Sequence, residues 1–282
     1  MSRNNEERIG ARAAVDDIPP AASNEGSFSF ATPTEFVDLP SSGKYYPEGH
    51  PLHMKDSVEI RYMTAKDEDI LSSKTLLQKG LAIERFLNNV LVDKTIDTNT
   101  LYIGDKNAIL VAARITGYGG EYTTRTTCPG CADSSDFTFD LEQLTTYKAD
   151  DWADFDIKEH ADDRFLITLP QTKVTAEVRL LTSKDEIYLS KLTANKKKKK
   201  LPETTMTDLL RMFVVSVNGY TDPKSIKAFI DGLPAKDSRY LRSAYEKVIP
   251  NVDMTQLFNC ESCGFEQEVT VPFTADFFWP KR

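Results

Sequence analysis

Two short stretches of the chain share one pattern: Cys128-Pro129-Gly130-Cys131 and Cys260-Glu261-Ser262-Cys263. They contain all four cysteines of the sequence. A Cys-x-x-Cys turn allows both thiolates to reach one metal ion, and two such turns complete a tetrahedral four-cysteine zinc site. The sequence therefore predicts one structural Zn²⁺ per chain, with Cys128, Cys131, Cys260 and Cys263 as its ligands.

The gap between the two turns is unusually long. It runs from Ala132 to Asn259, which is the length of a whole domain, whereas an ordinary zinc ribbon has roughly 15–20 residues there. We therefore expect each turn to belong to a separate structural unit.

An internal repeat accounts for this gap. Residues 59–68 (EIRYMTAKDE) match residues 177–186 (EVRLLTSKDE), and Val37-Asp38-Leu39-Pro40 resembles Ile167-Thr168-Leu169-Pro170 less closely. Further matches pair Ile83, Phe86, Leu87 and Val90 with Leu210, Phe213, Val214 and Val217, and Asp105, Ile109 and Ala112 with Asp237, Leu241 and Ala244. The order is kept while the spacing drifts, which is typical of a duplication followed by loop insertions and deletions.

These patterns predict an α+β protein made of an internally duplicated strand–helix–helix–helix–knuckle unit. A knuckle here means a Cys-x-x-Cys turn with its flanking strands, and the two knuckles would form one composite zinc ribbon. The expected boundaries are a disordered or partner-ordered tail at 1–30, repeat one at 31–140, an acidic linker at 141–166, repeat two at 167–273 and an aromatic C-terminal tail at 274–282.

Local signals place the elements of each repeat. We expect a strand over 58–62, a helix capped by Thr64, a helix carrying the apolar stripe from Ile83 to Leu91, a helix that Asp105 caps, and strands over 122–127 and 137–139. Thr182 is expected to cap the matching helix of repeat two. Residues 140–166 are expected to form a short helix or an ordered linker.

Several polar groups admit a second interpretation. The acidic residues after Thr64 and Thr182 could suggest a carboxylate pair for catalysis, but helix capping explains both copies without a substrate. His50 and His53 are expected to be loop histidines rather than metal ligands, because Pro51 opposes the helix that would align them. The run Lys196–Lys200 is expected to be a solvated connector rather than a phosphate-binding patch.

Composition limits the function further. The net charge of −8 argues against non-specific binding to nucleic acid or to an anionic membrane. The longest apolar run, Ala108–Ala113, is far too short to span a membrane, and no secretory signal is visible. Because we find no nucleophile set and no nucleotide-binding loop, and because four thiolates would fill the coordination sphere of zinc, we expect no catalysis and no small-molecule substrate.

Several strings of repeat one resemble one phage family. They are Leu39-Pro40-Ser41-x-Gly43, Tyr46-Pro47-x-Gly49, Glu59-Ile60-x-Tyr62-Met63-Thr64, Gly104-Asp105-Lys106-Asn107-Ala108-Ile109-Leu110 and Cys128-Pro129-x-Cys131. The chain is similar, over roughly residues 37–273, to the baseplate hub and hub-assembly proteins of T-even-type, contractile-tailed bacteriophages. The resemblance implies a structural or assembly role in the hub region of the tail baseplate, with other baseplate and hub proteins as partners. It also implies assembly in the host cytoplasm, followed either by a place in the virion tail baseplate or by a role in assembly alone.

One further expectation depends on this resemblance. A baseplate protein contacts several neighbours, so we expect exposed aromatic surface at Tyr45-Tyr46 and at Phe277-Phe278-Trp279. The alternative class is a zinc-ribbon module that binds nucleic acid or acts in regulation, but such a module usually has a basic face, whereas this chain is acidic.

Overall fold

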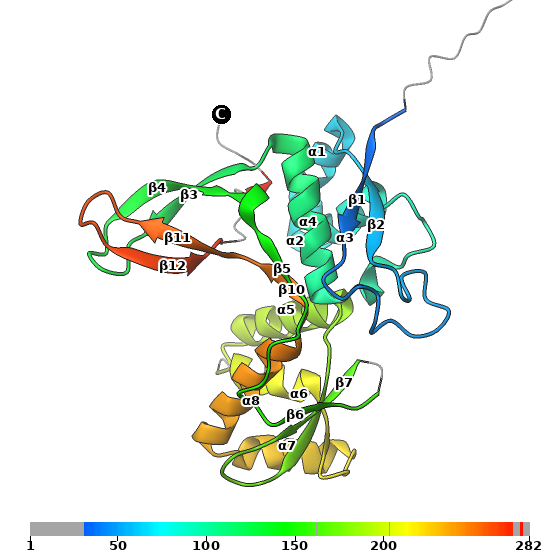
Figure 1. The fold of residues 1–282 in the computed structure, drawn as a ribbon, viewed down its shortest axis with the longest axis vertical. Coiled ribbons are helices and arrows are strands. Elements are labelled where there is room, and N and C mark those ends of the chain that lie inside the picture. The colour runs from blue at the N-terminus through cyan, green and yellow to red at the C-terminus, as the bar shows by residue number, and fades with distance from the viewer. Residues whose placement is uncertain (1–30, 162, 203, 273–276, 279–282) are drawn as a thin grey trace, which may run out of the picture. The chain divides into compact units, whose positions relative to one another are not determined.

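The computed structural model describes residues 31–161, 163–202, 204–272 and 277–278 of the chain. The chain divides into two units, Met1–Thr32 and Pro33–Arg282. All the elements below belong to the second unit, and Figure 1 shows their arrangement. The predicted tail at 1–30 and residues Phe273 and Trp279 lie outside the described residues.

The first part of the second unit begins with a β-hairpin and ends with another. Its elements are β1 (Thr34–Asp38), β2 (Ser57–Arg61), α1 (Ala65–Ser72), α2 (Lys74–Lys79), α3 (Ala82–Val90), the 3-10 helix η2 (Thr98–Thr100), α4 (Ile103–Tyr118), β3 (Glu121–Thr127) and β4 (Ser134–Asp140). The expected strands around the first Cys-x-x-Cys turn are therefore present, as β3 and β4.

The segment after β4 contains mainly strands. The 3-10 helix η3 (Leu141–Gln143) is followed by β5 (Thr145–Tyr147) and β6 (Ile157–Glu159). Strand β6 joins β7 (Arg164–Thr168), β8 (Thr175–Arg179) and β9 (Val214–Val217) in an antiparallel sheet of order β6-β7-β8-β9. Strand β5 pairs with β10 (Asn251–Asp253), far along the chain. This segment therefore contains one 3-10 turn and two short strands rather than a longer helix.

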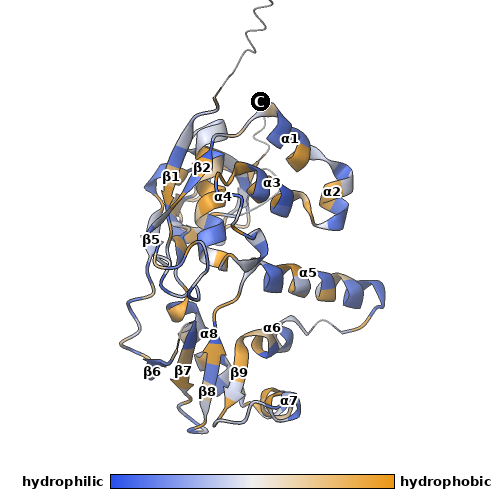
Figure 2. Cartoon of the chain, turned by 90° about the vertical axis from the view of Figure 1, so that its right-hand side faces the viewer, coloured by the Kyte–Doolittle hydropathy of each residue, from blue (hydrophilic) through white to orange (hydrophobic). Residues whose placement is uncertain are grey.

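The last part again combines a sheet, helices and a final hairpin. Its elements are β7 (Arg164–Thr168), β8 (Thr175–Arg179), α5 (Ser183–Lys198), α6 (Thr205–Phe213), β9 (Val214–Val217), α7 (Pro223–Gly232), α8 (Ala235–Val248), β10 (Asn251–Asp253), β11 (Thr255–Asn259) and β12 (Glu266–Thr270). The mixture of helices with antiparallel sheets confirms the α+β class. Figure 2 shows hydrophobic residues on β7, β8 and β9 and hydrophilic residues along much of α5.

The predicted order of one strand and three helices is too simple. In the first part the helix after β2 breaks at Ser73 into α1 and α2. In the last part β9 and α7 are inserted before α8, so Val214 and Val217 lie in a strand rather than on a helix. Apolar periodicity did not identify β9, because a buried strand and a buried helix both require apolar residues.

Both capping predictions are confirmed. Thr64 and Thr182 each form a capping box, with Asp67 and Asp185 at the third helical position. The prediction for Asp105 is wrong. Helix α4 begins at Ile103 with Tyr102 at the N-cap, and Asp105 lies buried in the first turn, where it accepts hydrogen bonds from a distant segment instead of from its own helix.

The lysine run is also not a connector loop. Lys196, Lys197 and Lys198 form the last turn of α5, where positive charge is favoured by the helix dipole. Lys196 Nζ lies 2.5 Å from a carboxylate oxygen of Asp208 at the start of α6. This lysine therefore joins two helices rather than facing solvent.

The predicted aromatic surfaces are wrong as well. Tyr45, Tyr46, Phe277 and Phe278 are all at most 5 % exposed. The Tyr46 hydroxyl donates to Asp105 and accepts the backbone N–H of Tyr102, so it supplies polar partners that the core needs. Buried Arg114 donates to the carbonyl oxygen of Phe277 at 2.6 Å and holds this residue against the core.

Candidate metal centre

Each Cys-x-x-Cys turn is carried by a two-stranded antiparallel hairpin. Strands β3 and β4 pair up to Thr127 and Ser134, and β11 and β12 pair up to Asn259 and Glu266. The first cysteine of each turn directly follows the last paired residue of its hairpin. The two hairpins lie side by side in Figure 1, and their turns lie at the same end.

The two turns have the same backbone hydrogen bonds. The N–H of Cys128 donates to Asp133 O at 2.8 Å, and the N–H of Ala132 donates to Cys128 O at 2.9 Å. In the second turn, the N–H of Cys260 donates to Phe265 O at 2.9 Å, and the N–H of Gly264 donates to Cys260 O at 2.8 Å. Both turns therefore present their cysteines in the same way.

The four sulfur atoms converge. Cys128 Sγ lies 3.8 Å from Cys263 Sγ, and Cys131 Sγ lies 3.8 Å from Cys260 Sγ. All four lie within 4.8 Å of one another. A tetrahedral zinc ion with bonds of about 2.3 Å to sulfur requires sulfur atoms about 3.8 Å apart. The donor set and its spacing thus fit a zinc ion held by thiolates.

The backbone around Cys128 favours its ionised form. Burial raises the pKa of this thiol, but hydrogen bonds from the backbone N–H groups of Cys131 and Gly130 outweigh burial, and the pKa falls to about 7. The N–H of Gly130 lies 3.3 Å from Cys128 Sγ. A metal ligand must be the thiolate, so the backbone favours metal binding at Cys128. At Cys263 the backbone hydrogen bond at Phe265 lowers the pKa, but the neighbouring thiols outweigh it and raise the pKa to about 12.

Apolar and polar contacts support the cluster from outside. Cys128 and Cys260 are buried with Phe258, and the rings of Phe137 and Phe258 meet edge to face with centroids 4.9 Å apart. The Ser262 hydroxyl donates to Asp133 at 2.5 Å and joins the two turns directly. Sequence reasoning missed this pair, because exposed Ser and Asp residues in turns carry no signal of a partner.

Comparison with known proteins gives the chain a family. A family model described as T4 bacteriophage base plate protein matches residues 32–279. The chain belongs to this family. Searches among curated proteins and among solved structures each found no match.

The family match includes both hairpins of this T4-type phage baseplate protein, so all four cysteines lie within it. Within the described residues of the baseplate protein, no other group of three or more His, Cys, Asp or Glu side chains was found that could hold a metal ion. His53 Nδ1 lies 2.6 Å from the carbonyl oxygen of Tyr46, and His50 Nε2 lies 2.9 Å from Thr100 Oγ1. Both loop histidines therefore have hydrogen-bond partners within the protein.

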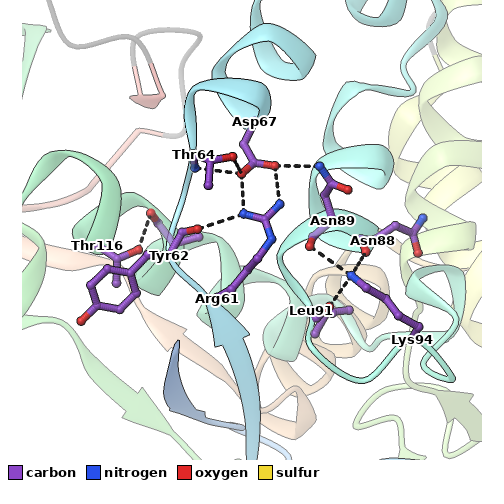
Figure 3. Close-up of polar contacts among 10 residues, drawn as sticks. Arg61, Tyr62, Thr64, Asp67, Asn88, Asn89, Leu91, Lys94 and Thr116 are labelled. Atoms are coloured by element: carbon purple, nitrogen blue, oxygen red, sulfur yellow. Dashed lines mark hydrogen bonds and ion pairs between the residues drawn. The ribbon is translucent and has the colours of Figure 1, made fainter. Parts of the chain in front are cut away.

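The buried carboxylates of the baseplate protein are structural anchors. Figure 3 shows Arg61, Thr64 and Asn89 converging on Asp67, which accepts from all three at 2.7–2.9 Å. Burial alone would raise the pKa of Asp67, but these hydrogen bonds outweigh it and bring the pKa to about 2. A carboxylate with every oxygen occupied by protein donors is a poor general base.

No helix within the described part of this baseplate protein combines the length and apolar character that a membrane crossing requires.

Proposed function

We propose that this baseplate protein has a structural or assembly role in the hub region of a contractile phage tail. In this role, one zinc ion bound by Cys128, Cys131, Cys260 and Cys263 would fix how its two halves meet. The observation that carries the proposal is the convergence of four cysteines from two distant hairpins to within 4.8 Å. Four thiolates saturate tetrahedral zinc and leave no position for a reactive water. Neighbouring baseplate and hub proteins would be its partners, in the host cytoplasm and then in the virion tail.

The proposal includes an internal duplication. Matching hydrogen bonds support it: Arg61 donates to both carboxylate oxygens of Asp67 at 2.7 and 2.9 Å, and Arg179 donates to both oxygens of Asp185 at 2.8 Å. Each arginine ends a strand, and each aspartate lies in the first turn of the next helix. The same contact thus closes the same strand-to-helix connection in each half.

A second matched contact lies between the hairpin loop and the last helix of each half. Asp105 on α4 accepts from the N–H and the hydroxyl of Ser41. Asp237 on α8 accepts from the N–H groups of Gln171 and Thr172 and from the Thr172 hydroxyl. In both halves this loop follows a Leu-Pro pair, so the weak sequence match at that point coincides with a shared tertiary contact.

Element boundaries explain the drift in spacing between the halves. The loop between β1 and β2 is longer than the loop between β7 and β8, and α7 is inserted before α8. The bounds of α3 and α6 align Leu87 and Val90 with Leu210 and Phe213. The sequence comparison had placed this helix one turn away, because two apolar stripes of the same period match in more than one register.

Metal analysis of the full-length protein tests the zinc site. Protein purified under reducing conditions should contain about one zinc per chain, because a closed four-thiolate site holds its metal firmly. Cys260→Ser should lose zinc and become sensitive to protease where the hairpins meet, while circular dichroism shows the helices retained. Ser72→Ala, at an exposed helix position, is the matched control. Less than about half an equivalent of zinc in the wild type would overturn the site.

Tail assembly tests the biological role separately. Phage carrying the Cys260→Ser substitution should yield fewer finished tails, and the wild-type chain should co-purify with baseplates or with their assembly intermediates. A chain found only in free form throughout infection would contradict the role. Salt-sensitive DNA binding at moderate salt would instead favour a nucleic-acid-binding function.

A further inference from the structure

Strand β1 has an open edge. It pairs with β2 on one side, and among the described residues no strand pairs with its other side. The pairing register shows which groups face that open side. Pro33 O and the N–H of Leu39 bond across to the β2 side, and backbone groups alternate along an antiparallel strand. The N–H and C=O groups of Thr34, Phe36 and Asp38 therefore point to the open edge.

The equivalent strand in the second half shows what such an edge accepts. Strand β7 pairs with β8 as β1 pairs with β2, and its other edge is covered by β6 in antiparallel orientation. The residues of β7 that face β6 are Arg164, Leu166 and Thr168: Arg164 O accepts from His160, and the N–H of Thr168 donates to Asp156. On the proposed duplication these residues correspond to Thr34, Phe36 and Asp38.

Side chains at the open edge of β1 are more exposed than their counterparts on β7, whose edge is covered by β6. Leu166, on the covered strand, is half-buried, whereas Phe36 is 72 % exposed. The inward-facing side chain of β6, Ile157, lies opposite Ile167 and is buried. In β1, Val37 takes the place that Ile167 has in β7. An added strand would therefore need an apolar residue opposite Val37 and would cover the ring of Phe36.

The acidic residues near this edge favour a basic partner. Glu35 faces inward beside the open edge, and burial raises its pKa. Asp38 and Glu59 lie on the same small sheet, whose basic residue, Arg61, is paired with Asp67. The β1 strand carries no basic residue. A second copy of β1 would bring more carboxylates to this sheet, whereas a basic residue opposite Glu35 would neutralise it.

We propose that the open edge of β1 binds an extended, basic segment of another protein as an added antiparallel strand. The segment carries an apolar residue opposite Val37 and a lysine or arginine opposite Glu35. Main-chain hydrogen bonds to Thr34, Phe36 and Asp38 supply affinity, and the two inward positions supply specificity. This inference uses the proposed duplication but not the zinc site, so it can fail while zinc binding stands.

A peptide built on β6 provides the probe. It is a labelled peptide of residues 154–161 with Asp154→Asn, Asp156→Asn and Glu159→Lys, which carries net positive charge and places lysine opposite Glu35 in the β6 register. The full-length protein should bind it about fivefold more tightly than the same peptide with glutamate retained, by fluorescence anisotropy at low salt. Hydrogen exchange should show new protection at Thr34, Phe36 and Asp38 rather than at Arg164 or Leu166.

Two substitutions at one position separate backbone pairing from apolar contact. Phe36→Pro removes an N–H that faces the open edge and leaves the bonds to β2 intact, so peptide binding should fall at least about tenfold. Phe36→Thr keeps the N–H and should lose only about two- to threefold. Both variants should retain wild-type zinc content and circular dichroism.

Three results would overturn the proposal. The first is equal binding of the peptide by wild type and Phe36→Pro, or no binding at all. The second is strong protection of the Phe36 amide in the protein alone, which would mean that the chain covers its own edge. The third is a dimer in light scattering that Phe36→Pro dissociates, which would assign the edge to a second copy.

Discussion

Ala132 and Gly264 occupy the same position in their two knuckles and share a left-handed backbone, with φ values of 60° and 67°. Each donates its N–H to the carbonyl of the first cysteine in its turn. A left-handed conformation costs an L-residue about 1–2 kcal/mol, and glycine avoids this cost. The first knuckle therefore carries backbone strain that the second does not.

Reciprocal substitutions at these two residues should have opposite effects. Ala132→Gly should raise the free energy of unfolding by up to about 1 kcal/mol, and Gly264→Ala should lower it by about 1–2 kcal/mol. A Cβ at Gly264 meets no atom within 4 Å, so backbone strain alone is tested. Urea unfolding measures the free energy of unfolding of both variants. Gly49→Ala, at another open left-handed position, is the control and should lower stability by a similar amount. A Gly264→Ala variant of unchanged stability would contradict the strain assigned to this position.

Gly130 is required for a different reason: the ring of Phe265 packs over it. A Cβ there would lie 2.9 Å from the Phe265 ring. Gly130→Ala should therefore destabilise the protein by about 1–3 kcal/mol. Phe265→Leu should cost stability alone but recover part of the loss in the Gly130→Ala background. A double-mutant cycle by urea unfolding checks this, and simple additivity of the two costs would exclude the contact as the cause.

Asp67 should make stability depend on pH in the acid range. Its pKa of about 2 in the folded protein lies below the ordinary 3.8, so folding favours the ionised form. The resulting stability, about 2 kcal/mol, is fully present above pH 4 and is lost as the pH falls toward 2. Asp67→Asn should lower stability at neutral pH and flatten this loss relative to wild type. Asp69→Asn, on the exposed side of the same helix, should leave the profile unchanged.

The lysine run should be energetically uneven. Lys196 contacts Asp208, which is only 6 % exposed, and the Thr204 hydroxyl. Lys196→Ala should cost about 1–3 kcal/mol, because it leaves a buried carboxylate with the more distant Arg211 as its basic partner. Lys199→Ala, at an exposed position, should cost almost nothing. Thermal unfolding of the two variants compares them, and equal costs would show that the run acts only through its total charge.

Local features of this protein were predictable from the sequence alone. The Cys-x-x-Cys turns, the caps at Thr64 and Thr182 and the hairpin strands each depend on residues within a few positions of one another, so spacing carries the information. The paired cysteines also predicted that the four sulfur atoms lie close together, as the structure shows, since two equivalent half-sites with no spare cysteine would complete a tetrahedron.

Features that join distant segments were decided only by the tertiary structure. Tyr45 and Tyr46 look like surface aromatics in a loop, but Asp105 and Tyr102 provide buried hydrogen-bond partners for this loop some 60 residues along the chain. Lys196 resembles a solvated lysine until α6 brings Asp208 beside it. In each case the side chain can lie either in water or in the protein interior, because a hydrogen bond or an ion pair offsets the cost of burying its polar group. Which of the two environments it occupies depends on packing between elements, which residue type and spacing do not specify.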